Sequence, residues 1–372
     1  MMGKRIIEAV IRGACSLNVY DVGETIEGLA AKLGKKPSEI LKLNSNENFF
    51  VPIELLRSVL RQVIEESDPR IYPRDEYKML REAIGGLTKI PPECIIIGAG
   101  GDQLIDLVSR IFLREGDEAL SIEPTFTIYE RCVKVQGAAY RSIPLKEDFS
   151  LDVDSMLSTI TPKTKVIFLC SPNNPTANQF RREDVLRLAD EFEGPVVIDE
   201  TYADFSGKTL IDAAIDLDNL MVLRTFSKTF GLAGLRVGYL AANRRLARTI
   251  DERFQMPYSV STIAIRAALK MIDKWPEIAG TLSDIRRERD VLVAELNSIG
   301  GVRAFPSETN FVLFQVNRDS KAVYRALLKR GIIIRDIGRV LKFDNCLRVT
   351  VAPRPLMERF IRELGEVMCE GA

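Results

Sequence analysis

Histidine is absent from this 372-residue sequence. Its absence excludes Ser-His-Asp and Cys-His catalytic devices, and it removes the commonest metal ligand and the usual proton carrier near neutral pH. We therefore expect no metal site. We expect proton transfer to rest on lysine, carboxylate, tyrosine or cysteine side chains, or on a bound cofactor.

An excess of charge of either sign is also lacking, because 52 Lys and Arg residues balance 52 Asp and Glu residues. This balance argues against nucleic acid or a membrane surface as the main partner. No segment reaches the about 20 apolar residues that a membrane-spanning helix requires. The apolar stretch at the N-terminus is interrupted by Glu8 and lacks the core of a signal peptide.

Paired cysteine spacing is missing as well. No two of the six cysteines stand in a C-x-x-C arrangement, and four adjoin apolar runs, which predicts buried free thiols and a cytoplasmic location. The six are Cys15, Cys94, Cys132, Cys170, Cys346 and Cys369.

Short apolar runs alternate with helical patterns from about Cys94 onward. Apolar residues make up 46% of the chain and charged residues 28%, which is typical of a packed globular protein. Continuous apolar strands joined by helices predict an α/β fold whose mainly parallel sheet of about seven strands is covered on both faces. The expected strands lie at 94–97, 118–122, 165–169, 195–199, 219–224 and 236–240.

The pattern changes after about Gln255, where two long helical stretches are followed by short strands and a terminal helix. We therefore expect three parts. Residues 1–45 form a segment that packs on the small domain or on a partner subunit, 46–257 form a large ligand-binding domain, and 258–372 form a small α+β domain.

Two stretches carry the strongest chemical signal. Residues 225–236 place Lys228 in a loop of small and hydroxyl residues after an apolar strand, and residues 196–202 place Asp199 at the end of another strand, with Tyr202 just beyond it. Strand ends are where open α/β sheets bind ligands. An amine, a carboxylate and a phenol suit pyridoxal 5'-phosphate (PLP): Lys228 forms the Schiff base, Asp199 pairs with the ring nitrogen and Tyr202 donates to the ring hydroxyl oxygen.

Further residues fit the same ligand, although each also has an ordinary structural interpretation. Asn174, in S-P-N-N-P-T, is either a turn residue or a second partner of the ring hydroxyl. Phe126 is either a core aromatic or a ring that stacks on the cofactor. The segment G-A-G-G-D-Q at 98–103 exposes a helix N-terminus to a phosphate, and Gln103 stands where a dinucleotide-binding fingerprint requires glycine.

Arginines supply candidate anion partners. Arg236, together with Ser227, can meet the cofactor phosphate. Arg348 alternates with apolar residues in C-L-R-V-T, where its guanidinium either holds a substrate carboxylate in bidentate fashion or forms a buried structural ion pair. Arg335 lies beside another short strand of the same region.

The order of these motifs resembles the fold-type I PLP-dependent aminotransferases, and within them the histidinol-phosphate aminotransferase branch, from about residue 18 to 365. The fragments that carry the resemblance are L-N-S-N-E-N (43–48), I-Y-P-R-D-E-Y (71–77), G-G-D-Q-L-I (100–105), E-P-T-F-T-I-Y (123–129), S-P-N-N-P-T (171–176), V-I-D-E-T-Y (197–202), T-F-S-K-T-F-G-L-A-G-L-R (225–236) and L-R-V-T-V (347–351).

The resemblance implies residue roles by position. Lys228, Asp199, Tyr202, Asn174 and Phe126 match the cofactor-ring contacts described above. The phosphate cup is matched by Gly101, Asp102, Gln103, Ser227 and Arg236, and the substrate-binding set by Arg348 for a carboxylate, Arg335 and Tyr20 for a substrate phosphate, and Asn48. Tyr72 matches a tyrosine that reaches the cofactor phosphate of the neighbouring subunit, which implies a homodimer with shared sites.

The sequence departs from the family pattern at three points. N-E-N-F-F-V replaces N-E-N-P-x-G, Ala177 replaces a glycine after N-P-T, and Gly101 replaces a hydroxyl residue of the phosphate cup. The Phe49–Phe50 change makes the loop near the substrate bulkier and more apolar, a feature that favours an aromatic side chain on the substrate.

The resemblance implies a transferase of nitrogenous groups in histidine biosynthesis. Histidinol phosphate and 2-oxoglutarate would become imidazole-acetol phosphate and glutamate by a ping-pong reaction. Two enzymatic alternatives stay open: an aromatic amino-acid aminotransferase, and a threonine-phosphate decarboxylase on the same scaffold. A PLP-binding regulator is disfavoured because no basic helix-turn-helix segment is present.

Overall fold

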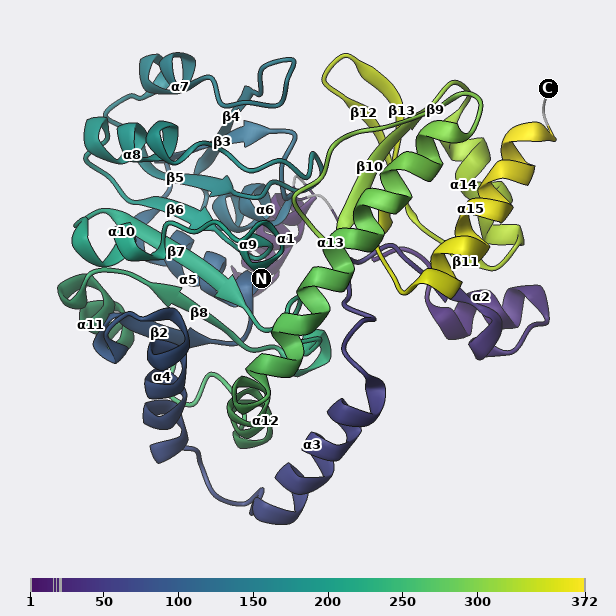
Figure 1. Cartoon of the computed structure of the whole chain (residues 1–372). Helices are drawn as coiled ribbons and strands as arrows, with labels where there is room; N and C mark the ends of the chain where they lie inside the picture. The colour runs from purple at the N-terminus through teal and green to yellow at the C-terminus, as the bar shows by residue number, and fades with distance from the viewer. Residues whose placement is uncertain (1, 16, 18, 20–21, 371–372) are drawn as a thin grey trace.

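The computed structural model describes residues 2–15, 17, 19 and 22–370. Two bodies of unlike size lie side by side, one built on a seven-stranded sheet and the other on a four-stranded sheet (Figure 1). We call these the large sheet and the small sheet. The long helix α13 (Trp275–Ser298) runs along the boundary between the two bodies (Figure 1).

The large sheet has the strand order β2-β8-β7-β6-β5-β3-β4, and all neighbouring strands are parallel except for the two pairs that involve β8. The expected mainly parallel seven-stranded sheet is therefore confirmed. Its strands are β2 (Ile95–Gly98), β3 (Glu118–Glu123), β4 (Ala139–Pro144), β5 (Thr164–Cys170), β6 (Val196–Asp199), β7 (Leu220–Thr225) and β8 (Gly238–Ala241).

Strand β4 was not expected from the sequence. It is an edge strand whose side chains are exposed or only half-buried, so it lacks the continuous apolar run by which the other strands are recognised. The apolar run at 236–240 does form a strand, but it lies antiparallel between β2 and β7. An apolar run indicates that a strand is buried on both faces, but it does not indicate whether the strand runs parallel or antiparallel to its neighbours.

Helices cover both faces of the large sheet (Figure 1). Successive side chains of a strand point to opposite faces, so Val196 and Ile198 join one core while Val197 joins the other. The helices of this body are α4 (Asp75–Thr88), α5 (Gly101–Phe112), α6 (Ile128–Val135), α7 (Val153–Thr159), α8 (Arg182–Glu191), α9 (Ala203–Ser206), α10 (Ile211–Asp216) and α11 (Arg244–Arg253).

The small sheet is antiparallel, with the order β12-β13-β10-β9. Its strands are β9 (Val302–Ala304), β10 (Phe311–Val316), β12 (Arg335–Val340) and β13 (Phe343–Thr350), and α14 (Ser320–Lys329) and α15 (Arg354–Cys369) pack against it. A separate short pair joins β1 (Leu41–Lys42) to β11 (Ile332–Ile333), so the N-terminal segment is anchored to this body.

The helix α12 (Thr262–Asp273) packs against α3 (Ile53–Glu66) and α4, and its buried face lies in the core of the large sheet. The packing therefore divides the chain later than residue 257. The division falls within α13, because Ile278 packs with the large-sheet core whereas Leu292 and Leu296 pack with the small-sheet core.

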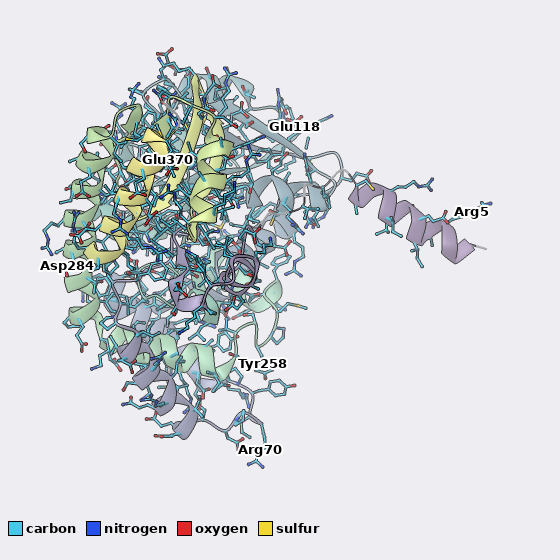
Figure 2. All side chains as sticks on the ribbon, turned by 90° about the vertical axis from the view of Figure 1, so that its right-hand side faces the viewer. Arg5, Arg70, Glu118, Tyr258, Asp284 and Glu370 are labelled. Carbon is cyan, nitrogen blue, oxygen red and sulfur yellow. The ribbon has the colours of Figure 1, made fainter. Side chains whose placement is uncertain are left out.

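Among the described residues, two α-helices precede β1. The helix α2 (Ile26–Leu33) lies against the small body, whereas α1 (Met2–Ala14) projects away from the rest of the molecule (Figure 2). The exposed side chains of α1 include Ile6, Ile7, Val10 and Ile11, each at least 60% exposed. A row of apolar side chains on a projecting helix is a surface that another chain can cover.

A search of the described residues finds no helix with both the length and the apolar character needed to cross a lipid bilayer.

The small-sheet core depends on aromatic packing between α15 and β10. Phe360 is fully buried, and its ring centroid lies 6.3 Å from that of Phe314. We expect Phe360→Ala to lower the free energy of unfolding by about 3–5 kcal/mol, as measured by urea titration, because it leaves a cavity in a packed core. The matched truncation Val135→Ala, at a side chain that is 54% exposed, should cost less than about 0.5 kcal/mol. Equal stabilities would contradict this account of the core.

Candidate active site

A cavity of about 550 Å³ lies between the two bodies, at the carboxyl ends of β5, β6 and β7 and against β12 and β13. The carboxyl ends of parallel strands meet at one edge of a sheet, which is where α/β proteins bind ligands. Eleven residues proposed from the sequence line this cavity: Gly101, Asp102, Phe126, Asn174, Asp199, Tyr202, Ser227, Lys228, Arg236, Arg335 and Arg348.

Lys228 reaches the cavity from the loop that follows β7. Its Nζ donates a hydrogen bond to the backbone carbonyl of Ser45, with an N–O distance of 2.7 Å. The pKa of Lys228 is lowered to about 8, chiefly by burial and also by Arg348 and Lys42, while Glu47 and Asp102 act in the opposite direction. The amine therefore loses its proton far more readily than an exposed lysine, which suits a nucleophile or a proton carrier.

Asp199 ends β6 and is 5% exposed. The Tyr129 hydroxyl donates to its Oδ2 at 2.8 Å, and the Thr201 hydroxyl and backbone N–H donate to its Oδ1 at 2.6 and 3.0 Å. Burial raises the pKa of Asp199, and these hydrogen bonds oppose that rise. Within the described part of the chain no ion pair to Asp199 is found, so a cation in the cavity would complete its environment.

Tyr202 lines the cavity just beyond β6. Asn46 Nδ2 donates to the Tyr202 hydroxyl oxygen at 2.9 Å, which leaves the hydroxyl hydrogen available to a ligand oxygen. Asn46 Oδ1 is buried and has no hydrogen-bond partner among the described residues. Asn174 lies nearby, and its side-chain oxygen accepts a short hydrogen bond from Arg348.

The far end of the cavity is suited to an anion. Helix α5 begins at Gly101, and the first N–H groups of a helix have no partner within it. Arg236 contacts Asp102 at 3.1 Å and Ser227 Oγ at 3.4 Å. Gly100 has φ +83°, and a Cβ there would lie 2.7 Å from Arg236 Nη2, so only glycine allows the arginine to come this close.

The opposite side of the cavity carries two arginines in register. Arg335 on β12 faces Arg348 on β13 across the small sheet. Arg348 is 7% exposed, its Nη2 donates to the Asn44 carbonyl at 2.6 Å, and its guanidinium lies over the Phe311 ring. Phe126 lines the cavity from the large sheet and meets Tyr129 edge to face, with ring centroids 5.7 Å apart.

Among the proposed residues that the structure describes, three do not line this cavity, namely Gln103, Asn48 and Tyr72. The Gln103 side chain accepts the Ala99 N–H and donates to Gln255, so these bonds occupy it away from the anion end. Asn48 was expected at the substrate, but its side chain makes other hydrogen bonds. Its Nδ2 donates to the Thr229 carbonyl, and its Oδ1 accepts from the Phe50 N–H.

Tyr72 is 71% exposed and stacks on Tyr258, with ring centroids 4.7 Å apart. It therefore lies on the surface of its own subunit, and its contact with a neighbouring subunit stays a prediction. Tyr20 lies outside the described residues.

Three residues of the site were not identified from the sequence, namely Tyr129, Thr201 and Asn46. Thr201 and Asn46 line the cavity, whereas Tyr129 does not line it and contacts Asp199 through its hydroxyl. Tyr129 follows Phe126 by three residues, and this spacing is the only local signal, because the bond to Asp199 joins residues that are 70 positions apart. In the N-S-N-E-N segment, Asn44 and Asn46 line the cavity and Asn48 does not.

The donor set fits pyridoxal phosphate. Lys228 supplies an amine of lowered pKa, Asp199 a buried carboxylate that has no cationic partner among the described residues, Tyr202 a phenol, and Asn46 a buried amide oxygen without a hydrogen-bond partner there. Arg236 and the start of α5 make an anion site beside them. These are the groups that an aldehyde, a protonated ring nitrogen, a ring hydroxyl and a phosphate each require.

Comparison with known proteins gives a consistent result. The family model for aminotransferase class I and II matches residues 38–364. A histidinol-phosphate aminotransferase of Thermoanaerobacter sp. (strain X514) is 35% identical over 329 residues, covering 88% of this chain and 93% of that protein. One from Roseiflexus castenholzii is 37% identical over 361 residues, covering 95% and 96%.

A solved structure gives the same picture. The histidinol-phosphate aminotransferase from Sinorhizobium meliloti, in complex with pyridoxal-5'-phosphate, superposes with a TM-score of 0.86 at 25% identity. The match covers 97% of each chain.

The hydrogen bond from Tyr129 can be tested directly. We expect Tyr129→Phe to weaken pyridoxal phosphate binding by about tenfold, because a hydrogen bond to a charged group contributes about 1.5 kcal/mol. Equilibrium dialysis of the cofactor measures this change. Tyr77→Phe is the matched control, since that hydroxyl bonds to the Val260 backbone outside the cavity. Unchanged affinity in Tyr129→Phe would show that the hydrogen bond does not hold Asp199 for the cofactor.

Proposed function

This chain belongs to the aminotransferase class I and II family, and we propose that it is a histidinol-phosphate aminotransferase. It is a PLP-dependent enzyme of amino-group transfer. In the proposed reaction, histidinol phosphate and 2-oxoglutarate are converted to imidazole-acetol phosphate and glutamate, a step of histidine biosynthesis. The observation that carries the proposal is a single cavity that holds Lys228, Asp199 and two arginines in register, Arg335 and Arg348.

Bound pyridoxal phosphate supplies an aldehyde that condenses with amines and a ring that withdraws electrons from the attached carbon. The residues of the cavity would hold it by its polar groups. Asp199 would accept from the ring nitrogen, and Tyr202 and Asn174 would meet the ring hydroxyl. Phe126 would cover one face of the ring, and Gly101, Asp102, Ser227 and Arg236 would hold the phosphate.

Proton transfer falls to Lys228, because the chain has no histidine. Its pKa of about 8 allows the amine to accept a proton from substrate carbon and to return it to a neighbouring atom. The carboxylate of Asp199 keeps the ring nitrogen protonated. Since burial raises the pKa of that carboxyl, the hydrogen bonds from Tyr129 and Thr201 matter for keeping it charged.

Substrate binding rests on the arginine side of the cavity. In the proposed reaction Arg348 holds the carboxylate of glutamate or 2-oxoglutarate, and Arg335 meets the phosphate of histidinol phosphate together with Tyr20. Two substrates must use one cavity in turn. A pair of adjacent cations serves this purpose, because it accepts either a carboxylate or a phosphate.

The enzyme is proposed to work as a homodimer. Exposed apolar side chains gather where the loop before α4 meets the segment after α11, and Tyr258 and Arg70 mark this side of the molecule in Figure 2. They are Ile71, Tyr72, Phe254, Met256 and Tyr258. A second copy that covers this surface would bring its Tyr72 toward the cofactor phosphate.

A cytoplasmic location is also proposed, and the buried free thiols of Cys94, Cys132, Cys170 and Cys346 support it.

The substrate is tested by half-reactions with the purified holoenzyme. We expect histidinol phosphate alone, and glutamate alone, to convert the absorption band of the bound cofactor to that of its amine form. Phenylalanine alone should leave the band unchanged. Conversion by phenylalanine at a similar rate would favour an aromatic aminotransferase, and release of carbon dioxide from threonine phosphate would favour a decarboxylase.

The covalent anchor needs its own control. Lys228→Ala should lose turnover and the visible band of the resting enzyme while keeping its circular dichroism spectrum, because the amine that condenses with the aldehyde is gone. Full turnover in this variant would refute the assignment.

Shared sites can be tested by mixing two inactive variants. Lys228→Ala keeps Tyr72, and Tyr72→Ala keeps Lys228, so a hybrid dimer holds one site with both residues intact. We expect activity to recover when the two proteins are unfolded and refolded together, and to stay low when either is refolded alone. Hybrid dimers that form without recovery would show that Tyr72 does not serve the neighbouring site.

A further inference from the structure

The segment that runs from Lys42, the last residue of β1, to the start of α3 holds the cavity together through its backbone. The Asn44 carbonyl accepts from Arg348, the Ser45 carbonyl accepts from Lys228, and the Asn46 carbonyl accepts from Asn310 at 3.0 Å. Three consecutive carbonyls thus contact the substrate-binding arginine, the reactive lysine and the small body. The position of this segment decides where the amine of Lys228 points.

An ion pair spans the same segment. Lys42 Nζ makes a short contact with a carboxylate oxygen of Glu47 and donates to Ser45 Oγ at 3.0 Å. The Lys42 and Glu47 side chains are 21% and 30% exposed. The second Glu47 oxygen, Oε2, is buried and has no hydrogen-bond partner among the described residues. One oxygen of this carboxylate is therefore shielded from solvent, two residues after the carbonyl that accepts from Lys228, and its charge is poorly screened there.

We propose that Lys42 and Glu47 act as positioning residues that set the proton affinity of Lys228, Glu47 favouring the charged amine and Lys42 opposing it. This inference rests on the proposed role of Lys228. Because the two charges lie on one segment and contact each other, their fields partly cancel at the amine. The amine can then be buried next to a carboxylate without being held permanently in its charged form.

The direction of each effect follows from the surroundings of Lys228. Glu47 raises its pKa and Lys42 lowers it, in the company of Asp102, which raises it, and Arg348, which lowers it. Asp199 and Arg236 line the same cavity. Of these charged groups, only Lys42 and Glu47 belong to the segment that also hydrogen-bonds the amine, so the pair couples the geometry of the amine to its charge.

The test is a pH titration of the holoenzyme, followed by the visible absorption of the bound cofactor, which changes when the nitrogen of Lys228 loses its proton. We expect Glu47→Gln to move the midpoint to lower pH and Lys42→Met to move it to higher pH, each by on the order of one pH unit. The double variant should return toward the wild-type midpoint, because both charges are gone. The conservative variants Lys42→Arg and Glu47→Asp keep the charges and should keep the midpoint.

The matched control is the exposed ion pair between Lys274 and Glu277, whose N–O distance is 3.2 Å. Lys274→Met and Glu277→Gln make the same changes of charge at residues that do not line the cavity, and they should leave the midpoint in place. Midpoints that stay fixed in Glu47→Gln and Lys42→Met, or that move in the same direction, would overturn the inference. Removing opposite charges must move the midpoint in opposite directions, whereas distortion of the loop does not depend on the sign of the charge removed. A wild-type enzyme without the visible band would instead refute the role of Lys228 itself.

Discussion

The site is organised around one buried carboxylate, that of Asp199. A charged carboxyl group inside a protein is stable only when hydrogen bonds and a nearby cation replace its water. The chain supplies the hydrogen bonds, from Tyr129 and Thr201, and leaves the cation to the ligand. Under the proposed role of Asp199, this arrangement favours a ring with a basic nitrogen. It also explains why a tyrosine, which is neutral and stays protonated, stands behind the carboxylate: a charged partner there would satisfy Asp199 without any cofactor.

The amine is governed by the opposite constraint. Lys228 must lose its charge easily, so it is buried and lies in the field of Arg348 and Lys42. In the proposed complex the two ends of one heterocycle would meet groups whose pKa values are shifted toward each other, that of Asp199 upward and that of Lys228 downward. In both cases desolvation is the largest cause. The charges of the cofactor and of these protein groups would therefore be complementary. The fold provides a buried edge of the large sheet at which they can meet with little screening by water.

The position of a site residue could be predicted from the sequence when that residue ends or follows a recognisable strand. Asp199 and Lys228 end or follow buried strands, and the ends of parallel strands converge, so their meeting follows from the α/β pattern. Tyr129 and Asn46 could not be assigned in this way, because their roles arise from contacts across 70 and 156 positions of the chain. Asn48 illustrates the limit. Asn46 lines the cavity, but the side chain of Asn48, two residues later, hydrogen-bonds backbone groups instead. Strand β4 was missed for a different reason, since a half-exposed edge strand has no continuous apolar run.

The helix α13 belongs to both bodies. Over 24 residues, about 36 Å of helix, its first half is packed into the core of the large sheet and its second half into the core of the small sheet. Neither core can melt without exposing part of a helix that the other core still holds. The two bodies should therefore lose their structure in one cooperative transition, although each has a sheet of its own. The cavity between them would then persist up to the temperature at which the whole chain unfolds.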